Sequence, residues 1–347
     1  IMKLRMFSII LVILILGAAS GLILGELLVN DNGEVVEQAK IPTKEQSKIS
    51  EDIFEAPIST YEDVLPDNIP KIDHDLEIAI LPNEIILPEP VKEPEQKAWE
   101  INALPFDIHK IDGRPAIAIV IDDVGVAQAW TRKAIQMPAP MTMSFIPYGR
   151  NLDEHVANAR AIGHEIMLHL PMEPKNPDVN PGDNALMTSL DGIELVDRML
   201  WNLEQFEGYM GVNNHMGSKF TANAEGMGIV LNEIKLRGLS FIDSVTSGDT
   251  VGYKIAQAIG VPTTTRDIFL DHVKTEEAIW KQLNKVEALA QKKGTALAIG
   301  HPHKETIKVL SEWAQDLETR GFVMVPASVV LKIRNGYPSE DVVAVQN

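Results

Sequence analysis

The chain has 347 residues, of which 45% are hydrophobic, and it carries a net charge of −18. This length allows one large domain or two smaller ones, and the acidity argues against nucleic-acid binding, which needs a basic surface. There is no cysteine, which excludes disulfides, thiolate nucleophiles, cysteine-based zinc sites and a lipid anchor on an N-terminal cysteine.

The first 28 residues predict a membrane anchor. Residues 6–25 form an uncharged apolar stretch, and about 20 such residues are enough to cross a bilayer as a helix. Lys3 and Arg5 precede this stretch, so the positive-inside rule places the N-terminus in the cytoplasm and the remainder in the periplasm or another extracytoplasmic space. The competing interpretation is a signal peptide cleaved near residues 17–20, which would release a secreted protein. We expect the uncleaved inner-membrane anchor, because the apolar stretch continues through residues 22–24.

Most of the negative charge lies in residues 29–112, which contain 20 acidic and 7 basic residues. Residues 1–28 carry a net charge of +1, so residues 113–347 have a net charge of only −6. Prolines recur among the acidic residues of 29–112. Such a composition buries too little apolar surface to offset the entropy cost of ordering, so we expect residues 29–112 to be an acidic, proline-rich linker that is extended or disordered.

From residue 113 onward, short apolar runs alternate with longer amphipathic segments. Predicted strands cover residues 116–121, 141–146, 165–169, 209–212, 240–242, 261–264, 296–299 and 322–325. Predicted helices cover residues 128–136, 153–161, 190–206, 224–237, 250–259, 275–293 and 304–319. Continuously apolar strands that alternate with helices are typical of a parallel α/β sheet. We therefore predict one domain over residues 113–347, an α/β, irregular TIM-like barrel of about seven or eight βα units. No GxGxxG motif follows the first strand, so nothing indicates a dinucleotide site.

The predicted strands end in side chains that can bind a metal or transfer a proton. Five of the nine histidines lie at or just beyond strand ends: His169, His215, His272, His301 and His303. Asp122, Asp123 and Asp243 end strands as well. A single Asp or His in such a position is more often a helix cap or a structural group, but capping favours Ser, Thr and Asn over His. Because the strand ends of a parallel barrel converge on one face, the whole set predicts a single functional pocket.

The kinds of residue in this pocket predict a divalent metal ion. Imidazole and carboxylate ligands without thiolates are typical of catalytic zinc, and they also suit cobalt, nickel or manganese. A catalytic zinc keeps three protein ligands and one open position for a water molecule, whose pKa it lowers. An Asp beside the ligands can then act as general base, and a His opposite can protonate the leaving group.

Three motifs resemble those of the NodB-type polysaccharide deacetylases. Residues 119–123 (IVIDD) are similar to the first motif, residues 163–169 (GHEIMLH) to the second and residues 297–301 (LAIGH) to the last. The runs HLPME, NNHMGSKFT, FIDS and IGHPH resemble the divergent branch of this superfamily more closely than the typical branch. The resemblance covers about residues 113–335. It implies a NodB-type barrel and a metal-dependent carbohydrate deacetylase.

The resemblance also implies roles for individual residues. Asp122 would be the general base, while Asp123 and His169 would be metal ligands. His301 would be the general acid near the leaving amine, and Asp243 would occupy the place of a supporting carboxylate.

Two positions depart from the typical pattern. Where the second motif has another His four residues after the first, this chain has Glu173. His215, at the next strand end, is our preferred third ligand, and Glu173 is the alternative. The typical third motif has an Arg-Pro pair that orients the base, and Asn213 and Asn214 replace it here. The remaining candidates, predicted to contact the substrate, are Asn214, His303 and Arg266.

The leading hypothesis is a metal-dependent hydrolase that removes acetyl groups from an envelope glycan, which agrees with export through the inner membrane. The alternative is an inactive barrel that binds a glycan or a protein partner in the envelope. The absent His and Arg favour this alternative, whereas the adjacent carboxylates Asp122 and Asp123 argue against it. A metal phosphoesterase is disfavoured, because only Lys219 and Arg266 supply positive charge near the predicted strand ends.

Overall fold

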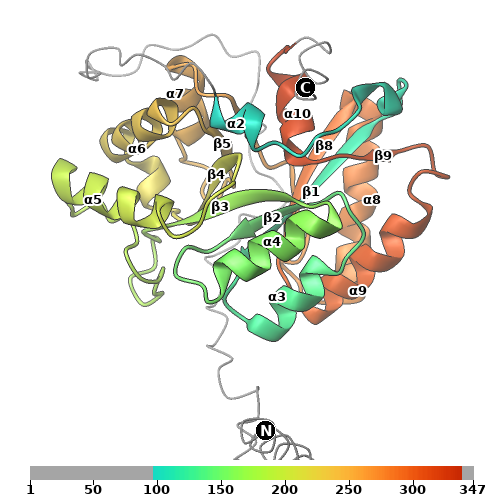
Figure 1. Cartoon of the computed structure of the whole chain (residues 1–347), viewed down its shortest axis with the longest axis horizontal. Helices are drawn as coiled ribbons and strands as arrows, with labels where there is room; N and C mark the ends of the chain where they lie inside the picture. The colour runs from blue at the N-terminus through green and yellow to red at the C-terminus, as the bar shows by residue number, and fades with distance from the viewer. Residues whose placement is uncertain (1–96, 338–347) are drawn as a thin grey trace, which may run out of the picture. The chain divides into compact units, whose positions relative to one another are not determined.

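The computed structural model describes residues 97–337, which form a parallel sheet surrounded by helices (Figure 1). The strands are β1 (Ala116–Val124), β2 (Thr142–Phe145), β3 (Glu165–Met172), β4 (Gly211–Met216), β5 (Ser240–Asp243), β6 (Thr263–Thr265), β7 (Ile268–Phe269), β8 (Thr295–Gly300) and β9 (Val323–Met324). The helices are α2 (Ala98–Ile101), α3 (Gln128–Ile135), α4 (Leu152–Ile162), α5 (Gly192–Leu203), α6 (Ala224–Leu236), α7 (Gly252–Ala258), α8 (Glu276–Lys293), α9 (Lys304–Trp313) and α10 (Ala327–Arg334).

The strand order is β6-β5-β4-β3-β2-β1-β8-β7, and β9 pairs with the start of β1. The sheet curves into a half-barrel (Figure 1), and in the described part of the chain no pairing joins β6 to β7. The two strands belong to one extended segment that changes partner at Arg266 and Asp267. The Arg266 amide donates to the carbonyl of Asp243 on β5, and the Asp267 amide donates to the carbonyl of Leu297 on β8. The predicted parallel α/β architecture is therefore confirmed, with a less regular closure than a TIM barrel.

The capping residues and terminal charges of α8 explain why a helix forms where the sequence predicts one. The Thr275 side chain accepts a hydrogen bond from the Ala278 amide at the first turn, and acidic residues follow it there. Lys292 and Lys293 lie in the last turn, and Gly294 ends the helix with φ 80°, a conformation that costs glycine little. These charges complement the helix dipole at both ends.

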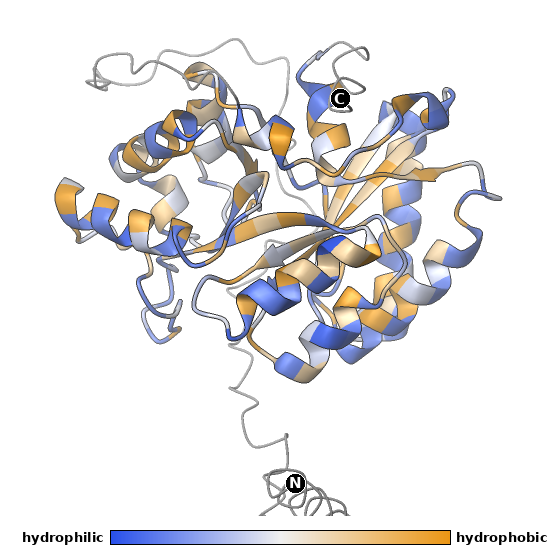
Figure 2. Ribbon diagram, viewed as in Figure 1, coloured by the Kyte–Doolittle hydropathy of each residue, from blue (hydrophilic) through white to orange (hydrophobic). Residues whose placement is uncertain are grey.

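The side chains of β1 contribute to two hydrophobic core clusters. Its residues alternate between them: Ile117, Ile119 and Ile121 belong to one cluster, and Ala116, Ala118 and Val120 belong to the other. The first cluster includes the buried faces of the surrounding helices, and the second includes α10 and Trp99. Figure 2 shows the hydrophobic strands and the mixed character of the outer helices. By the same alternation, Asp122 falls on the side of the second cluster.

The segment before β1 packs on the domain, which corrects the predicted linker boundary at residue 112. Trp99 on α2 is 1% exposed, and its amide donates to the carbonyl of Gly238. The Asn102 side chain donates to the carbonyl of Tyr209, and the Leu104 amide donates to the buried carboxylate of Glu165. Residues 97–112 therefore belong to the folded domain, because Trp99 supplies apolar surface that the composition of the segment as a whole concealed.

The predicted membrane anchor and the linker up to residue 96 lie outside the described residues. Within residues 97–337, no helix is both long enough and apolar enough to span a membrane.

Several strands continue past their predicted ends. β1 was predicted to end at residue 121 but reaches Val124, β3 reaches Met172, and β4 reaches Met216. Polar side chains at these ends weaken the apolar signal, although the backbone continues to pair with neighbouring strands. As a result, the candidate residues Asp122, His169 and His215 lie within strands, which gives them firmer positions than loops would.

Candidate metal and catalytic site

A β-bulge at the end of β1 directs two adjacent carboxylates into one site. The register between β1 and β2 shifts between Ile121 and Val124, and Asp123 has φ 58°, which is uncommon for a residue other than glycine. In a regular strand the side chains of Asp122 and Asp123 would point to opposite faces. The bulge re-aims one of them, so that both lie near His169 Nε2, at 3.6 Å for Asp122 and 3.3 Å for Asp123.

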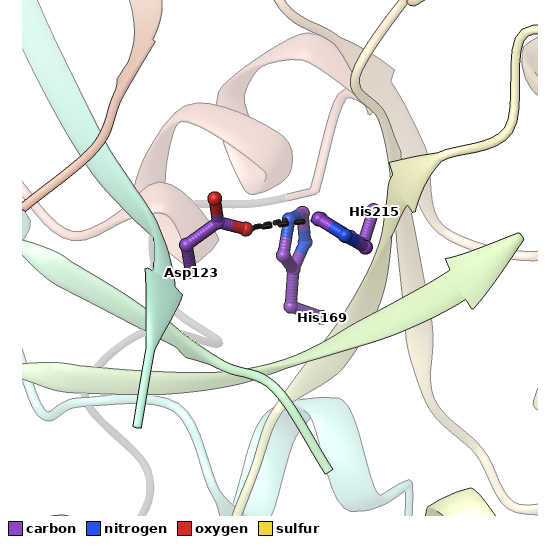
Figure 3. A group of neighbouring side chains, drawn as sticks. All are labelled: Asp123, His169 and His215. Carbon is purple, nitrogen blue, oxygen red and sulfur yellow. Dashed lines mark ion pairs between the residues drawn. The ribbon is translucent and has the colours of Figure 1, made fainter. Parts of the chain in front are cut away.

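Asp123, His169 and His215 converge from β1, β3 and β4 (Figure 3). The Asp123 Oδ1 atom lies 3.3 Å from His169 Nε2 and 2.9 Å from His215 Nδ1. The two imidazole rings meet edge to face, with their centroids 5.0 Å apart. One potential ligand atom from each of the three residues lies within 4.8 Å of the other two.

The chemistry of this cluster fits a divalent cation. Asp123 Oδ1 is buried and has no hydrogen-bond partner, although two imidazole nitrogens are close to it. A buried carboxylate oxygen without a donor is costly, and a cation would compensate for it. One carboxylate and two imidazoles are a known ligand set for catalytic zinc, which leaves a fourth position open.

Asn213 on β4 connects the two carboxylates to His169. Its side-chain amide donates to Asp122 Oδ1 at 2.8 Å, and its side-chain oxygen lies 2.9 Å from His169 Nδ1 and accepts from the Ser144 hydroxyl at 2.5 Å. The amide orientation follows from Asp122, because an ionised carboxylate only accepts hydrogen bonds. His169 must then carry a proton on Nδ1, so in the neutral ring Nε2 holds the lone pair that can bind a cation.

The surroundings give the two aspartates opposite properties. Burial raises the pKa of Asp122, although His169 and His301 oppose the effect. Burial would also raise the pKa of Asp123, but His215 and His169 hold it well below its ordinary value. Asp122 therefore suits a proton acceptor, and Asp123 suits a permanently charged ligand.

His301 at the end of β8 pairs with Asp271, which follows β7. Its Nδ1 lies 2.9 Å from Asp271 Oδ1, and its backbone amide donates to Asp271 Oδ2 at 2.6 Å. Burial would lower the pKa of His301, but Asp271, Asp123 and Asp122 raise it to about 9. The imidazole is therefore protonated at neutral pH. Sequence reasoning did not assign Asp271 a role, although it had placed the neighbouring His272 at or just beyond a strand end.

Glu173 does not belong to the metal cluster, which corrects its prediction as an alternative ligand. Its Oε2 accepts from the amide and the hydroxyl of Thr188, each at 2.6 Å, and its Oε1 accepts from Lys219 Nζ at 2.7 Å. These donors hold the carboxylate in the loop that follows β3. Both carboxylate oxygens are thus occupied by structural hydrogen bonds.

The structure does not bring Asp243 or Asn214 to the cluster either. Asp243 is fully buried and accepts from the amides of Val245 and Tyr253 and from the Thr250 hydroxyl. It organises the loop before α7 rather than supporting catalysis directly. Asn214 accepts from the Ser244 amide at 2.9 Å and donates to the carbonyl of Met216, so it links β4 to the same loop. Both residues lie near the predicted strand ends, but their side chains are held by this loop and do not join the cluster.

The other two predicted substrate contacts are Arg266 and His303. Arg266 donates to the carbonyls of Ser244 and Val245, and burial lowers its pKa to about 10. His303 is buried beside His301, with the ring centroids 5.9 Å apart. Burial lowers the pKa of His303 to about 4, so it is neutral while its neighbour is charged.

Comparison with known proteins identifies the family. The family model of the divergent polysaccharide deacetylases matches residues 119–331, which is more than half of the chain. The chain therefore belongs to the divergent polysaccharide deacetylase family, as its motifs had predicted.

Similar proteins occur in other bacteria. The uncharacterised protein YibQ of Escherichia coli is 36% identical over 217 residues, which cover 62% of this chain and 67% of YibQ. An uncharacterised protein of Haemophilus influenzae is 33% identical over 201 residues, covering 58% of this chain and 71% of that protein. The crystal structure of an uncharacterised protein of Agrobacterium tumefaciens superimposes with a TM-score of 0.65 and 30% identity, covering 67% of this chain and 95% of that one.

Proposed function

We propose that this protein is a metal-dependent hydrolase that removes acetyl groups from an N-acetylated glycan of the cell envelope. The observation that carries the proposal is the bulge that brings both Asp122 and Asp123 close to the His169 imidazole. A pure binding surface has no use for two adjacent carboxylates with pKa values shifted in opposite directions. Such divergence is typical of acid–base sites.

Three side chains would hold the ion: Asp123 through Oδ1, His169 through Nε2 and His215 through Nδ1. A divalent ion bound there supplies Lewis acidity, which polarises a carbonyl group and lowers the pKa of a water molecule. The hydrogen bond that His169 Nδ1 donates to the Asn213 side-chain oxygen fixes the orientation of the His169 ring, as a supporting partner does in well-formed metal sites.

Asp122 and His301 would carry the protons. Asp122, held by Asn213, accepts a proton from the attacking water. His301, kept protonated by Asp271, donates a proton to the departing amine nitrogen. Both groups are buried, which strengthens electrostatic interactions and favours general acid–base catalysis over exchange with bulk water.

We also propose that the domain acts outside the inner membrane. The support is the apolar stretch of residues 6–25 with its preceding positive charges, and the family description is consistent with an envelope glycan as partner. An uncleaved anchor keeps the domain at the membrane, and cleavage would release it.

An inactive barrel that binds a glycan or a protein partner is the second candidate. The neutral Asn213 contacts Asp122 where the typical family pattern has a charged arginine. Without that charge, burial leaves the pKa of Asp122 raised, so a larger fraction of this carboxyl group is already protonated and cannot accept a proton from water.

Acetate release by the full-length chain tests the proposed hydrolase. Wild-type protein loaded with zinc and the matched variant Asp122→Asn would be incubated with N-acetylglucosamine oligomers and with peptidoglycan fragments. We expect acetate from the wild type and a loss of about 10²–10⁴-fold in the variant, with bound metal unchanged. Full activity in Asp122→Asn would refute the assigned base. No acetate from metal-loaded wild type on either substrate would favour the inactive barrel.

A further inference from the structure

A second group of metal-binding side chains lies among the described residues, beside the first. Asp271, His301 and His303 each offer one potential ligand atom within 4.8 Å of the other two. All three side chains are buried. They come from the loop after β7 and from the end of β8, and one carboxylate with two imidazoles again suits zinc and related cations.

The position of His303 directs its ring to this group. It occupies the N-cap position of α9, yet its side chain makes no capping hydrogen bond. Its ring packs instead beside His301, with an interplanar angle of 30°. Pro302, whose φ is restricted, separates the two histidines in the sequence.

Asp271 is already held in place before any ion binds. Its Oδ2 accepts from the His301 amide at 2.6 Å and from the Thr306 hydroxyl at 2.8 Å. Its Oδ1 lies 2.9 Å from His301 Nδ1, so a single proton occupies the space between these two potential ligand atoms. An ion bound to both atoms would have to replace this hydrogen bond.

We propose that Asp271, His301 and His303 form a second divalent-cation site, and that an ion bound there inhibits the hydrolase by removing His301 from proton transfer. The inhibition rests on the proposed function, whereas the binding site itself does not. Binding here is weaker than at the first cluster. Asp123 Oδ1 has no hydrogen bond to lose, but Asp271 Oδ1 must give up its bond to His301.

The number of zinc ions bound to the full-length chain tests this site. Protein stripped with a chelator would be titrated with zinc alone, and the bound metal would be counted by calorimetry and elemental analysis. We expect about two ions per wild-type chain, one tight and one weak. His303→Ala retains the tight ion only, and His215→Ala retains the weak one only. His272→Ala, which removes an exposed imidazole next to Asp271, serves as matched control and retains both.

The outcomes separate this proposal from the proposed function. A single ion that is lost in His215→Ala and unaffected by His303→Ala contradicts the second site and leaves the hydrolase standing. No bound ion contradicts both. Thermal melting checks that the variants fold, and His303→Gln replaces His303→Ala if the smaller side chain destabilises the protein. In the wild type, acetate release falls in step with occupancy of the weak site; unchanged release at full occupancy would overturn the inhibitory role.

Discussion

Asn213 and Asp122 share a buried hydrogen bond of 2.8 Å, donated by the side-chain amide and accepted by the carboxylate. The oxygen of the same amide lies 2.9 Å from His169 Nδ1. One neutral side chain therefore orients the candidate base and also sets the tautomer of a candidate metal ligand. The candidate base Asp122 and the candidate ligand His169 are thus both hydrogen-bonded to the same side chain.

Removal of the Asn213 side chain should weaken metal binding without unfolding the protein. In Asn213→Ala, His169 loses the acceptor for its Nδ1 proton, and we expect metal affinity to fall by about 10–100-fold. A competition titration with a chelating zinc indicator measures the effect. The neighbouring variant Asn214→Ala is the matched control. The Asn214 side chain hydrogen-bonds to the Met216 carbonyl, the Thr246 hydroxyl and the Ser244 amide. It should lower the melting temperature and leave zinc affinity unchanged. Wild-type affinity in Asn213→Ala would contradict the assigned tautomer.

Substitution of Glu173 should change stability rather than metal content. Glu173→Gln weakens the hydrogen bonds to Thr188 and the ion pair with Lys219, and we expect a loss of about 1–2 kcal/mol in the free energy of unfolding. Denaturant unfolding gives this value, and elemental analysis gives the metal content. Loss of the tight ion in this variant would restore Glu173 as a ligand.

Hydrolysis should depend on pH as a bell-shaped curve. Asp122 acts in its ionised form, so activity rises through its pKa, which burial places above 3.8. His301 acts in its protonated form, so activity falls as the pH rises through about 9. The profile of kcat/KM against pH shows both limbs.

Asp271→Asn tests the assignment of the alkaline limb. Loss of the Asp271 charge removes the main group that raises the pKa of His301, so the alkaline limb should move to lower pH while the acid limb stays in place. An unmoved alkaline limb would show that another group titrates there.

The packing of Trp99 predicts that the segment before β1 stabilises the domain. Trp99→Ala should cost about 3–5 kcal/mol in the free energy of unfolding, as is typical when a buried aromatic residue is truncated. Ile101→Ala is the control on the same helix, because Ile101 is 51% exposed and should change stability little. Urea unfolding of the full-length chain compares the two variants. Equal stabilities would show that residues 97–112 contribute nothing to the fold.

The order of strands and helices could be predicted because each apolar run is short, β-branched and followed by an amphipathic segment. Among the α-helices and strands of the described residues, α2, α10 and β7 were not predicted. β7 has only two residues and continues the segment that contains β6. The N-terminal segment of residues 97–112 was misassigned because composition averages over a window, whereas the packing depends on the single side chain of Trp99.

The candidate site was only partly predictable. The sequence placed Asp123, His169 and His215 at the ends of the first, third and fourth predicted strands, and the curved parallel sheet brings them together. For Asp243 and Asn214, the same reasoning gave the strand end but not the direction of the side chain, which the following loop determines. The bulge at Asp123 had no sequence signal, because its positive φ is adopted by a residue other than glycine.

The most direct test of the metal site is an anomalous-scattering map at the zinc edge, from crystals of the full-length protein grown with one equivalent of zinc. Our account predicts a peak bound by Asp123 Oδ1, His169 Nε2 and His215 Nδ1, at about 2.0–2.2 Å from each atom. A peak coordinated by Glu173 instead, or no peak among these three side chains, would contradict it.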